Sequence, residues 1–272
     1  MNTQTQPIHS SKDLQTKITD RIQELAQATD AARVSEEMLR YLDMCARFHQ
    51  YSFCNLWLIL MAKPEATFVA GFKKWQTFKR FVRMGENGIP ILAPVMTAII
   101  NDKGEEEQRL VGFKVVYVFD ICQTDGDPLP DLPEWKSPEK NVELMNRLTQ
   151  FALDKGIQIQ VKCIGHDIQG VSLGGKIILD YEAGTKTLIH EIAHEMLHHV
   201  DCVLTNSTIR ELEAESVAYV VARHFGLGGL SSPNYNALHG ATSELILEHL
   251  ERIRNTAVEM IKAMKDNPDP VY

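Results

Sequence analysis

Apolar residues recur at helical spacing through the first sixty residues of the chain. Leu14, Ile18, Ile22 and Leu25 follow Ser11, whose hydroxyl can cap the first turn of a helix. The same spacing predicts helices over about 31–48 and 53–61, the second of them ending before Pro64. Residues 1–10 are polar and show no such period, so we expect a disordered tail there.

Further along, the pattern changes to apolar runs typical of strands. Residues 91–100 and 110–119 are two such runs, and the polar stretch 101–108 predicts a hairpin connection between them. A Pro-rich, acidic segment follows, and we expect a linker at 128–139. The pattern therefore divides the chain into an N-terminal domain, 11–127, and a C-terminal domain, 140–272.

The C-terminal half alternates helical and strand patterns. It predicts a helix over 142–154, a strand over 157–164 and a hairpin partner over 171–180. Three helices follow, the second ending near Gly226 and the last spanning about 241–264. We therefore expect an α+β protein of two domains, the first built from helices and an antiparallel sheet.

Charge, cysteine content and hydropathy indicate in which cellular compartment the protein works. Of the net charge of −8, −7 falls in residues 128–272, where 13 Lys and Arg face 20 Asp and Glu. The five cysteines are scattered and form no C-x-x-C, which indicates reduced thiols. No apolar signal region opens the chain, and the run 56–62 is too short to span a bilayer. We expect a cytoplasmic protein without a membrane partner.

The segment from His190 to His194 reads H-E-x-x-H. On a helix, residues four apart share one face, so His190 and His194 can bind one Zn²⁺ while Glu191 acts as general base. The alternative is a surface helix that carries these residues by chance. Leu197 and Val200 stand where a third-histidine motif would need Gly and His, so that class is excluded. We interpret His198 and His199 as polar residues near the helix C-terminus.

A catalytic zinc ion needs a third protein ligand, and the next helix offers three acids. Glu211 falls roughly 50° from the centre of that helix's apolar stripe, Glu215 roughly 90° and Glu213 roughly 110°. Glu211 is therefore our preferred ligand, with Glu215 as the alternative. For Glu213 we favour a solvated first turn.

The strand predicted over 174–180 precedes the metal helix. At a sheet edge it could hold an extended peptide by β-augmentation. An ordinary hairpin strand explains the same pattern.

A basic and aromatic stretch in the N-terminal half suits single-stranded nucleic acid, since cations follow phosphates and aromatic faces stack on bases. The candidates for contact are Lys73, Lys74, Trp75, Lys79, Arg80 and Arg83. The aromatic residues fit a second interpretation. Phe72, Trp75, Phe78 and Val82 recur at helical spacing, which is typical of a helix that buries one face.

Four segments together resemble the N-terminal domain of the ArdC antirestriction proteins. They are residues 48–55 (FHQYSFCN), 66–75 (ATFVAGFKKW), 80–89 (RFVRMGENGI) and 118–124 (VFDICQT). The H-E-x-x-H segment and residues 211–222 are similar to the zincin-like metallopeptidase domain of that family and, distantly, to the ImmA/IrrE metallopeptidases. The turn at 83–88 departs from the family's R-K-G-E-K-G pattern by losing two cations.

The resemblance implies an antirestriction protein of a mobile element that binds single-stranded DNA and carries a gluzincin-like zinc site. By position, His190, His194 and Glu211 would be ligands, Glu191 the catalytic acid/base, and a peptide or protein the substrate. Tyr235 falls where the family tends to have a Tyr, which suggests oxyanion stabilisation; a buried core Tyr is the alternative. Two other functions remain open. One is a repressor-cleaving regulatory protease, and the other is a DNA-binding protein with an inactive metal site.

Overall fold

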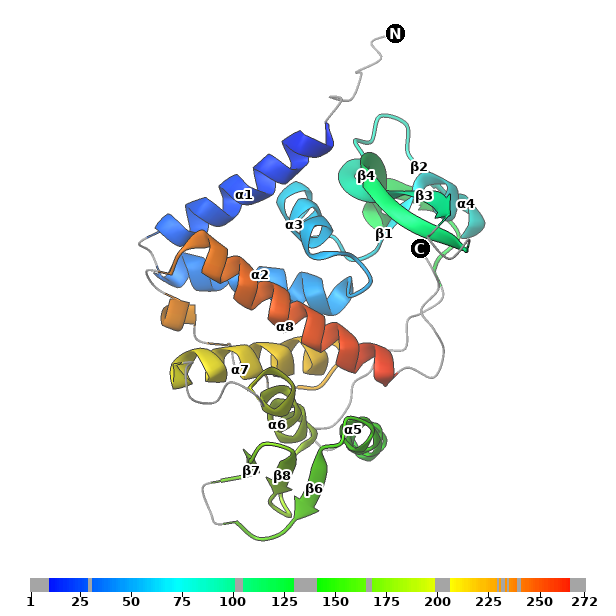
Figure 1. Ribbon diagram of the computed structural model, residues 1–272. Helices are drawn as coiled ribbons and strands as arrows, with labels where there is room; N and C mark the ends of the chain where they lie inside the picture. The colour runs from blue at the N-terminus through cyan, green and yellow to red at the C-terminus, as the bar shows by residue number, and fades with distance from the viewer. Residues whose placement is uncertain are drawn as a thin grey trace. The chain divides into compact units, whose positions relative to one another are not determined.

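The computed structural model describes residues 10–28, 31–100, 105–129, 141–164, 168–198, 206–228, 230, 233, 235–238 and 241–264. They form a mixed α and β architecture (Figure 1). The chain divides into two compact units, Met1–Arg21 with Tyr51–Pro130, and Ile22–Gln50 with Asp131–Val271. The division falls within helix α1 (Ser11–Gln27). The units therefore do not coincide with the expected domains 11–127 and 140–272, and most of the expected linker lies outside the described residues.

A three-stranded antiparallel sheet organises the first unit. Strand β4 (Glu106–Asp120) lies in its centre, between β1 (Val69–Gly71) and β3 (Ile89–Ile100). The pairing of β3 with β4 confirms the predicted hairpin, whose residues 101–104 lie outside the described part. Helix α3 (Phe53–Ala62) packs on this sheet, and the buried Asn55 side chain exchanges two hydrogen bonds with the backbone of Leu92, 2.8 and 2.9 Å long.

The basic stretch forms a short helix followed by a strand. Helix α4 (Phe72–Thr77) ends before Lys79, which adopts a positive φ of 55°, and the chain continues as β2 (Arg80–Val82). Strand β2 pairs with β5 (Thr124–Gly126), which the single-turn helix η1 (Ile121–Gln123) joins to β4. The interpretation of 72–82 as a single helix is therefore wrong. The helix ends at Thr77, and residues Arg80–Val82 form a strand that pairs with the distant strand β5.

In the second unit, a three-stranded sheet has the order β6-β8-β7. Strands β7 (Gly170–Ser172) and β8 (Lys176–Leu179) form a tight antiparallel hairpin, and β6 (Gln158–Val161) runs parallel to β8. Two predictions are therefore wrong. The run 171–180 is two strands rather than one, and it forms no hairpin with 157–164, because β6 pairs with β8 in parallel. Strand β8 lies in the centre of the sheet, so the alternative of an ordinary hairpin strand describes it. The edge strands are β6 and β7.

Helices make up the rest of the second unit. They are α2 (Ala31–Arg47), α5 (Val142–Asp154), α6 (Thr185–His198), α7 (Ser207–His224), the short η2 (Tyr235–Leu238) and α8 (Ser243–Ala263). Helix α6 lies between the β6-β8-β7 sheet and α7 (Figure 1). Helix α7 packs against α2, α6 and α8, so it is buried on several sides.

Helix α2 belongs to this unit through polar contacts with α7. The Tyr219 hydroxyl donates to the Asp43 carboxylate at 3.0 Å, and His224 Nδ1 lies 2.7 Å from the Ala46 carbonyl oxygen. Among the described residues, no helix combines the length and apolar character needed to cross a membrane.

Candidate metal centre

Helix α6 places two histidines side by side. His190 and His194 are one turn apart on a segment without Gly or Pro, and their Nε2 atoms are 3.0 Å apart. The helix is rigidly held, because its other faces bury Leu188, Ile189 and Ile192 in the core. The local spacing predicted from the sequence is therefore the spacing that the fold keeps.

The carboxylate of Glu211 on α7 completes a group of three donors. Its oxygens lie 3.5 Å from His190 Nε2 and 3.4 Å from His194 Nε2. A tetrahedral ion with bonds of about 2.0–2.2 Å holds its ligands about 3.3–3.6 Å apart, which matches these separations. Two imidazoles and one carboxylate are also the donor set that zinc accepts in catalytic sites. The three side chains therefore fit a divalent metal such as zinc.

The electrostatics of the group suit a cation. Burial lowers the pKa of both His190 and His194, so each imidazole favours its neutral form, which is the form that binds metals. Burial also raises the pKa of Glu191 to about 7, and the neighbouring Glu211 charge acts in the same direction. A carboxyl group with a pKa near neutrality can exchange protons at working pH.

These side chains open onto a cavity of about 460 Å³. The edge strand β7 and the following turn line it together with His190, Glu191, His194, His198, Arg210 and Glu211. Gly170 approaches Glu191 so closely that a Cβ at this position would lie 2.9 Å from the Glu191 Cγ and Oε1 atoms. Only glycine lets the edge strand come this near to the candidate base.

Glu195 fixes that wall of the cavity to the metal helix. Its carboxylate accepts hydrogen bonds from the Ser172 hydroxyl at 2.6 Å and from the backbone N–H groups of Leu173, Gly174 and Gly175. Burial raises the pKa of Glu195, but these hydrogen bonds outweigh it and the net effect lowers the pKa. The sequence pattern does not reveal this role of Glu195, because only the tertiary structure brings its four hydrogen-bond donors to α6.

A buried polar chain continues behind His194. With Nε2 facing the other ligands, His194 Nδ1 can donate to His198 Nδ1 at 3.1 Å, and His198 Nε2 to the Glu213 carboxylate at 2.9 Å. The other oxygen of Glu213 accepts from His249 Nδ1 on α8 at 2.7 Å, and Arg252 lies 3.4 Å away. Such partners fix the tautomer and ring orientation of a metal-binding histidine.

One prediction is wrong here, because Glu213 is 0% exposed rather than solvated. His198 does lie at the end of helix α6, as predicted, but its side chain is buried and hydrogen-bonded to Glu213. The sequence of α7 shows one apolar stripe, whereas the helix is covered on several sides. His198 did leave a signal in the sequence, since it continues the four-residue spacing of His190 and His194. His199 lies outside the described residues.

Tyr235 does not line the cavity. Its side chain is buried in the helical core, where its hydroxyl lies 3.1 Å from the Ser216 hydroxyl, and burial raises its pKa. The position of Tyr235 therefore does not support a role in oxyanion stabilisation. Tyr235 is a buried core tyrosine, which was the alternative.

The six candidate DNA contacts separate into different environments. Trp75 is 0% exposed, packs with Ala70 and Phe119, and donates its indole N–H to the Phe119 carbonyl at 3.0 Å. It cannot stack on a base, so its assignment as a contact residue is wrong. The neighbouring aromatics Phe72 and Phe81 are instead 51% and 60% exposed.

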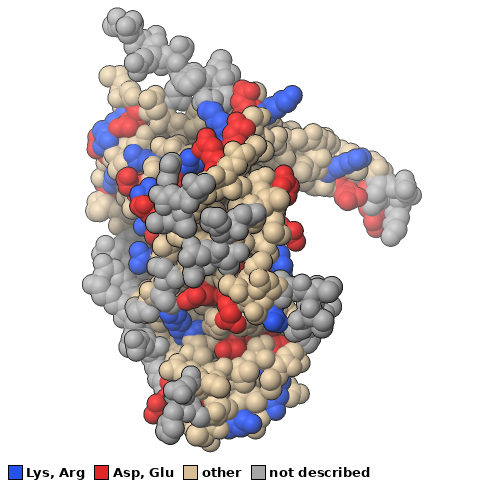
Figure 2. Space-filling model, turned by 90° about the vertical axis from the view of Figure 1, so that its left-hand side faces the viewer, with Lys and Arg blue, Asp and Glu red and all other residues tan. Residues whose placement is uncertain are grey.

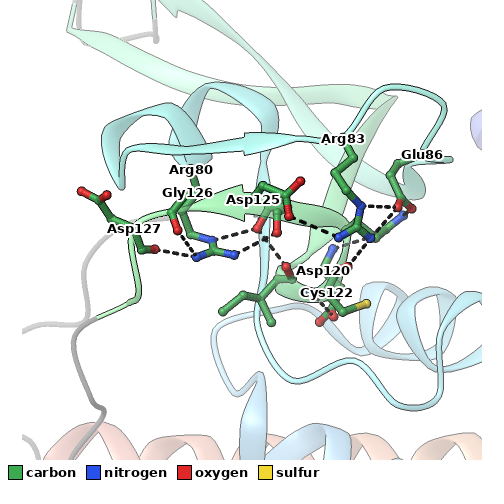
Figure 3. A network of polar contacts seen from close by, with 11 residues as sticks. Arg80, Arg83, Glu86, Asp120, Cys122, Asp125, Gly126 and Asp127 are labelled. Atoms are coloured by element: carbon green, nitrogen blue, oxygen red, sulfur yellow. Dashed lines mark hydrogen bonds and ion pairs between the residues drawn. The ribbon is translucent and has the colours of Figure 1, made fainter.

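Arg80 and Arg83 are engaged within the protein (Figure 3). Arg80 donates to the carbonyls of Thr124 at 2.9 Å and Asp127 at 2.5 Å, which fastens β2 to the chain around β5. Arg83 donates to the Glu86 carboxylate at 2.7 Å and to the Cys122 carbonyl. Both guanidinium groups therefore hold the fold of this unit together, although part of the Arg83 side chain remains exposed.

Lys73 and Lys79 are exposed, and Lys74 lies half-buried with its ammonium 5.3 Å from the centre of the Phe78 ring. Lys73 and Lys79 are therefore accessible to a phosphate backbone. On the face shown in Figure 2, positive and negative side chains are interspersed, so any basic surface on that face is local.

Comparisons with known proteins show what this chain is similar to. Residues 12–119 match the N-terminal domain of anti-restriction factor ArdC. The metal-free crystal structure of the antirestriction ArdC protein from the R388 plasmid aligns with a TM-score of 0.51 and 17% identity, covering 79% of this chain and 85% of that one. The Mn(II)-bound structure of the R388 protein aligns with a TM-score of 0.47 and 18% identity, covering 83% and 98%.

A sequence relative extends the comparison. An uncharacterized protein of Bacillus anthracis is 26% identical over 261 residues, which cover 78% of this chain. The alignment covers only 44% of that relative's length. Residues 12–119 are therefore similar to the ArdC N-terminal domain, and the fold is similar to that of the R388 protein.

Proposed function

We propose that this protein binds single-stranded DNA through its N-terminal half and carries a zinc-dependent, gluzincin-like peptidase site in its C-terminal half. The observation that carries the second part is the convergence of His190, His194 and Glu211, with Glu191 buried beside them on the same cavity. The ArdC likeness of residues 12–119 supports the first part. The setting is a mobile element whose incoming DNA needs protection from restriction.

The chain's own residues suggest how hydrolysis would proceed. His190, His194 and Glu211 would hold zinc, which supplies Lewis-acid activation of a water molecule when bound. Beside a divalent cation the Glu191 carboxylate is held in its ionised form, which can accept a proton from the attacking water and pass it to the leaving amine. The edge strand β7 offers backbone groups along which an extended peptide can be aligned.

The main alternative is a DNA-binding protein in which the metal is structural. Structural zinc sites are usually closed by four protein ligands, whereas catalytic sites keep one position open. Among the described residues, three ligands face a cavity of about 460 Å³, which favours a catalytic site. The regulatory-protease alternative is favoured if the N-terminal half binds a protein and not DNA.

Metal content and cleavage test the peptidase part. The purified full chain is assayed for zinc by mass spectrometry and incubated with a peptide mixture derived from a bacterial proteome. We expect one zinc per chain and cleavage that Glu191→Gln abolishes without loss of the metal. Glu248→Gln, at an exposed position of α8, is the matched control. Cleavage retained in pure Glu191→Gln protein would contradict the assigned base.

Salt-dependent binding tests the DNA part. A fluorescent oligothymidylate is titrated with the full chain at two salt concentrations. Replacing Lys73, Lys74 and Lys79 by Ala should weaken binding and reduce the salt slope by about 2, since each phosphate contact to single strands contributes about 0.7. Lys12, Lys17 and Lys114 are exposed lysines of the same unit and provide a triple control. Equal slopes for the two triple variants would rule out this surface.

A further inference from the structure

The candidate metal cavity contains a positive charge to which the proposed mechanism gives no role. Arg210 lies in the first turn of α7, immediately before Glu211, and its side chain lines the cavity. Its Nε atom is buried and has no hydrogen-bond partner. Within the described part of the chain, its guanidinium forms no hydrogen bond or ion pair. A buried guanidinium nitrogen without an acceptor is unfavourable, so the site favours a ligand that supplies one.

The two carboxylates that line the same cavity are committed elsewhere. Glu211 faces His190 and His194, at 3.5 and 3.4 Å. Glu191 receives a hydrogen bond from the Ser172 backbone. Neither forms an ion pair with Arg210. The contrast with Arg80, whose guanidinium is surrounded by protein acceptors, shows what a purely structural arginine looks like in this chain.

We infer that Arg210 is a substrate-binding residue that takes a carboxylate group of the peptide. A guanidinium presents planar, paired donors that match a carboxylate, and a charge-assisted pair in a confined cavity is stronger than one in water. The carboxylate can come from an Asp or Glu side chain or from the C-terminus of the peptide. The inference rests on the proposed peptidase function. It specifies the substrate class as peptides that present an acidic side chain or a C-terminus to this cavity.

Nuclear magnetic resonance of the arginine Nε–H groups tests this without relying on catalysis. The full ¹⁵N-labelled chain is prepared without added metal, and the Arg210 signal is assigned by its loss in Arg210→Lys. Three probes are titrated. N-acetyl-glutamate α-amide carries only a side-chain carboxylate, N-acetyl-alanine only a C-terminal carboxylate, and N-acetyl-glutamine α-amide carries neither.

We expect a saturable shift of the Arg210 Nε–H signal with one or both acids and none with the neutral amide. The backbone signals of Gly170 to Leu173 should shift in parallel. Binding measured from these backbone signals should be at least tenfold weaker in Arg210→Gln. Arg223→Gln, on the same helix, should bind as the natural chain does. Whichever acid gives the tighter binding identifies the source of the carboxylate.

Equal shifts with the neutral amide, or unchanged binding in Arg210→Gln, would overturn the inference. If Arg210→Gln does not fold, the comparison of probes in the natural chain still decides, because N-acetyl-glutamate α-amide and N-acetyl-glutamine α-amide differ only in the charge of the side-chain end. The outcome is independent of the cleavage assay. A chain that binds carboxylates but does not cleave peptides contradicts the proposed function and leaves the Arg210 site intact. A chain that cleaves peptides but does not bind carboxylates through Arg210 contradicts the inference and leaves the proposed function intact.

Discussion

Replacement of Glu213 by Gln removes the central charge of the buried chain behind His194. The carboxylate is 0% exposed and is held by His198 on one side and His249 on the other, with Arg252 nearby. Glutamine has nearly the same volume, so no cavity forms. Its amide can replace only one of the two acceptor oxygens, and its NH₂ group must then face the donor N–H of an imidazole.

The size of the effect follows from these contacts. Hydrogen bonds to a charged group contribute about 1.5–3 kcal/mol each, and breaking a buried ion pair costs about 3–5 kcal/mol. Burial raises the pKa of Glu213, but the hydrogen bonds from His198 and His249 outweigh it and lower the pKa from 4.5 to about 2. That depression corresponds to about 3 kcal/mol. Because the folded-state pKa is depressed, this stability is present above pH 4.5 and is lost as the pH falls toward 2.

We therefore expect Glu213→Gln to lower the free energy of unfolding by about 3 kcal/mol at pH 7. Urea unfolding followed by circular dichroism, in the presence of a chelator, measures the change without a contribution from bound metal. Hydrogen exchange of α7 and α8 locates it. Glu248→Gln, an exposed acid next to His249, should change stability by less than about 0.5 kcal/mol. A loss below about 1 kcal/mol for Glu213→Gln would refute the assigned role of the carboxylate.

Three further perturbations follow from other contacts. Glu195→Gln should destabilise the second unit by about 2 kcal/mol, because four donors lose a charged acceptor. It should also speed hydrogen exchange in the β7–β8 turn, and unchanged exchange there would contradict this. Gly126→Ala should destabilise the first unit by about 1–3 kcal/mol, since Gly126 has a φ of +133° and an added Cβ would overlap neighbouring backbone. Gly112→Ala, where a Cβ meets nothing within 4 Å, is its control in urea unfolding. Asp120 is buried, which raises its pKa, but backbone hydrogen bonds lower it overall. Its stabilising effect is therefore present above its ordinary pKa of 3.8 and lost in more acidic solution, and Asp120→Asn should flatten that dependence in tryptophan fluorescence.

The sequence by itself determined the features that depend on local spacing. The periodicity of apolar residues located α2, α3 and α5 to within a residue of their ends. The four-residue spacing of His190 and His194 fixed their common face, because helical geometry alone sets it. The helical position of Glu211 also favoured it over Glu213 and Glu215, and it is the acid that the fold brings to the two histidines.

Only the tertiary structure decided which polar groups are buried and which strands pair. Glu213 became a buried partner of His249 because α8 covers a side of α7 that the helical pattern assigned to solvent. Trp75 is buried against β4, where its indole N–H donates to a backbone carbonyl. Arg80 donates to backbone carbonyls around β5. Neither side chain is therefore presented to a nucleic acid. These outcomes depend on contacts between residues more than thirty positions apart, and a local pattern of hydrophobic and polar residues contains no information about them.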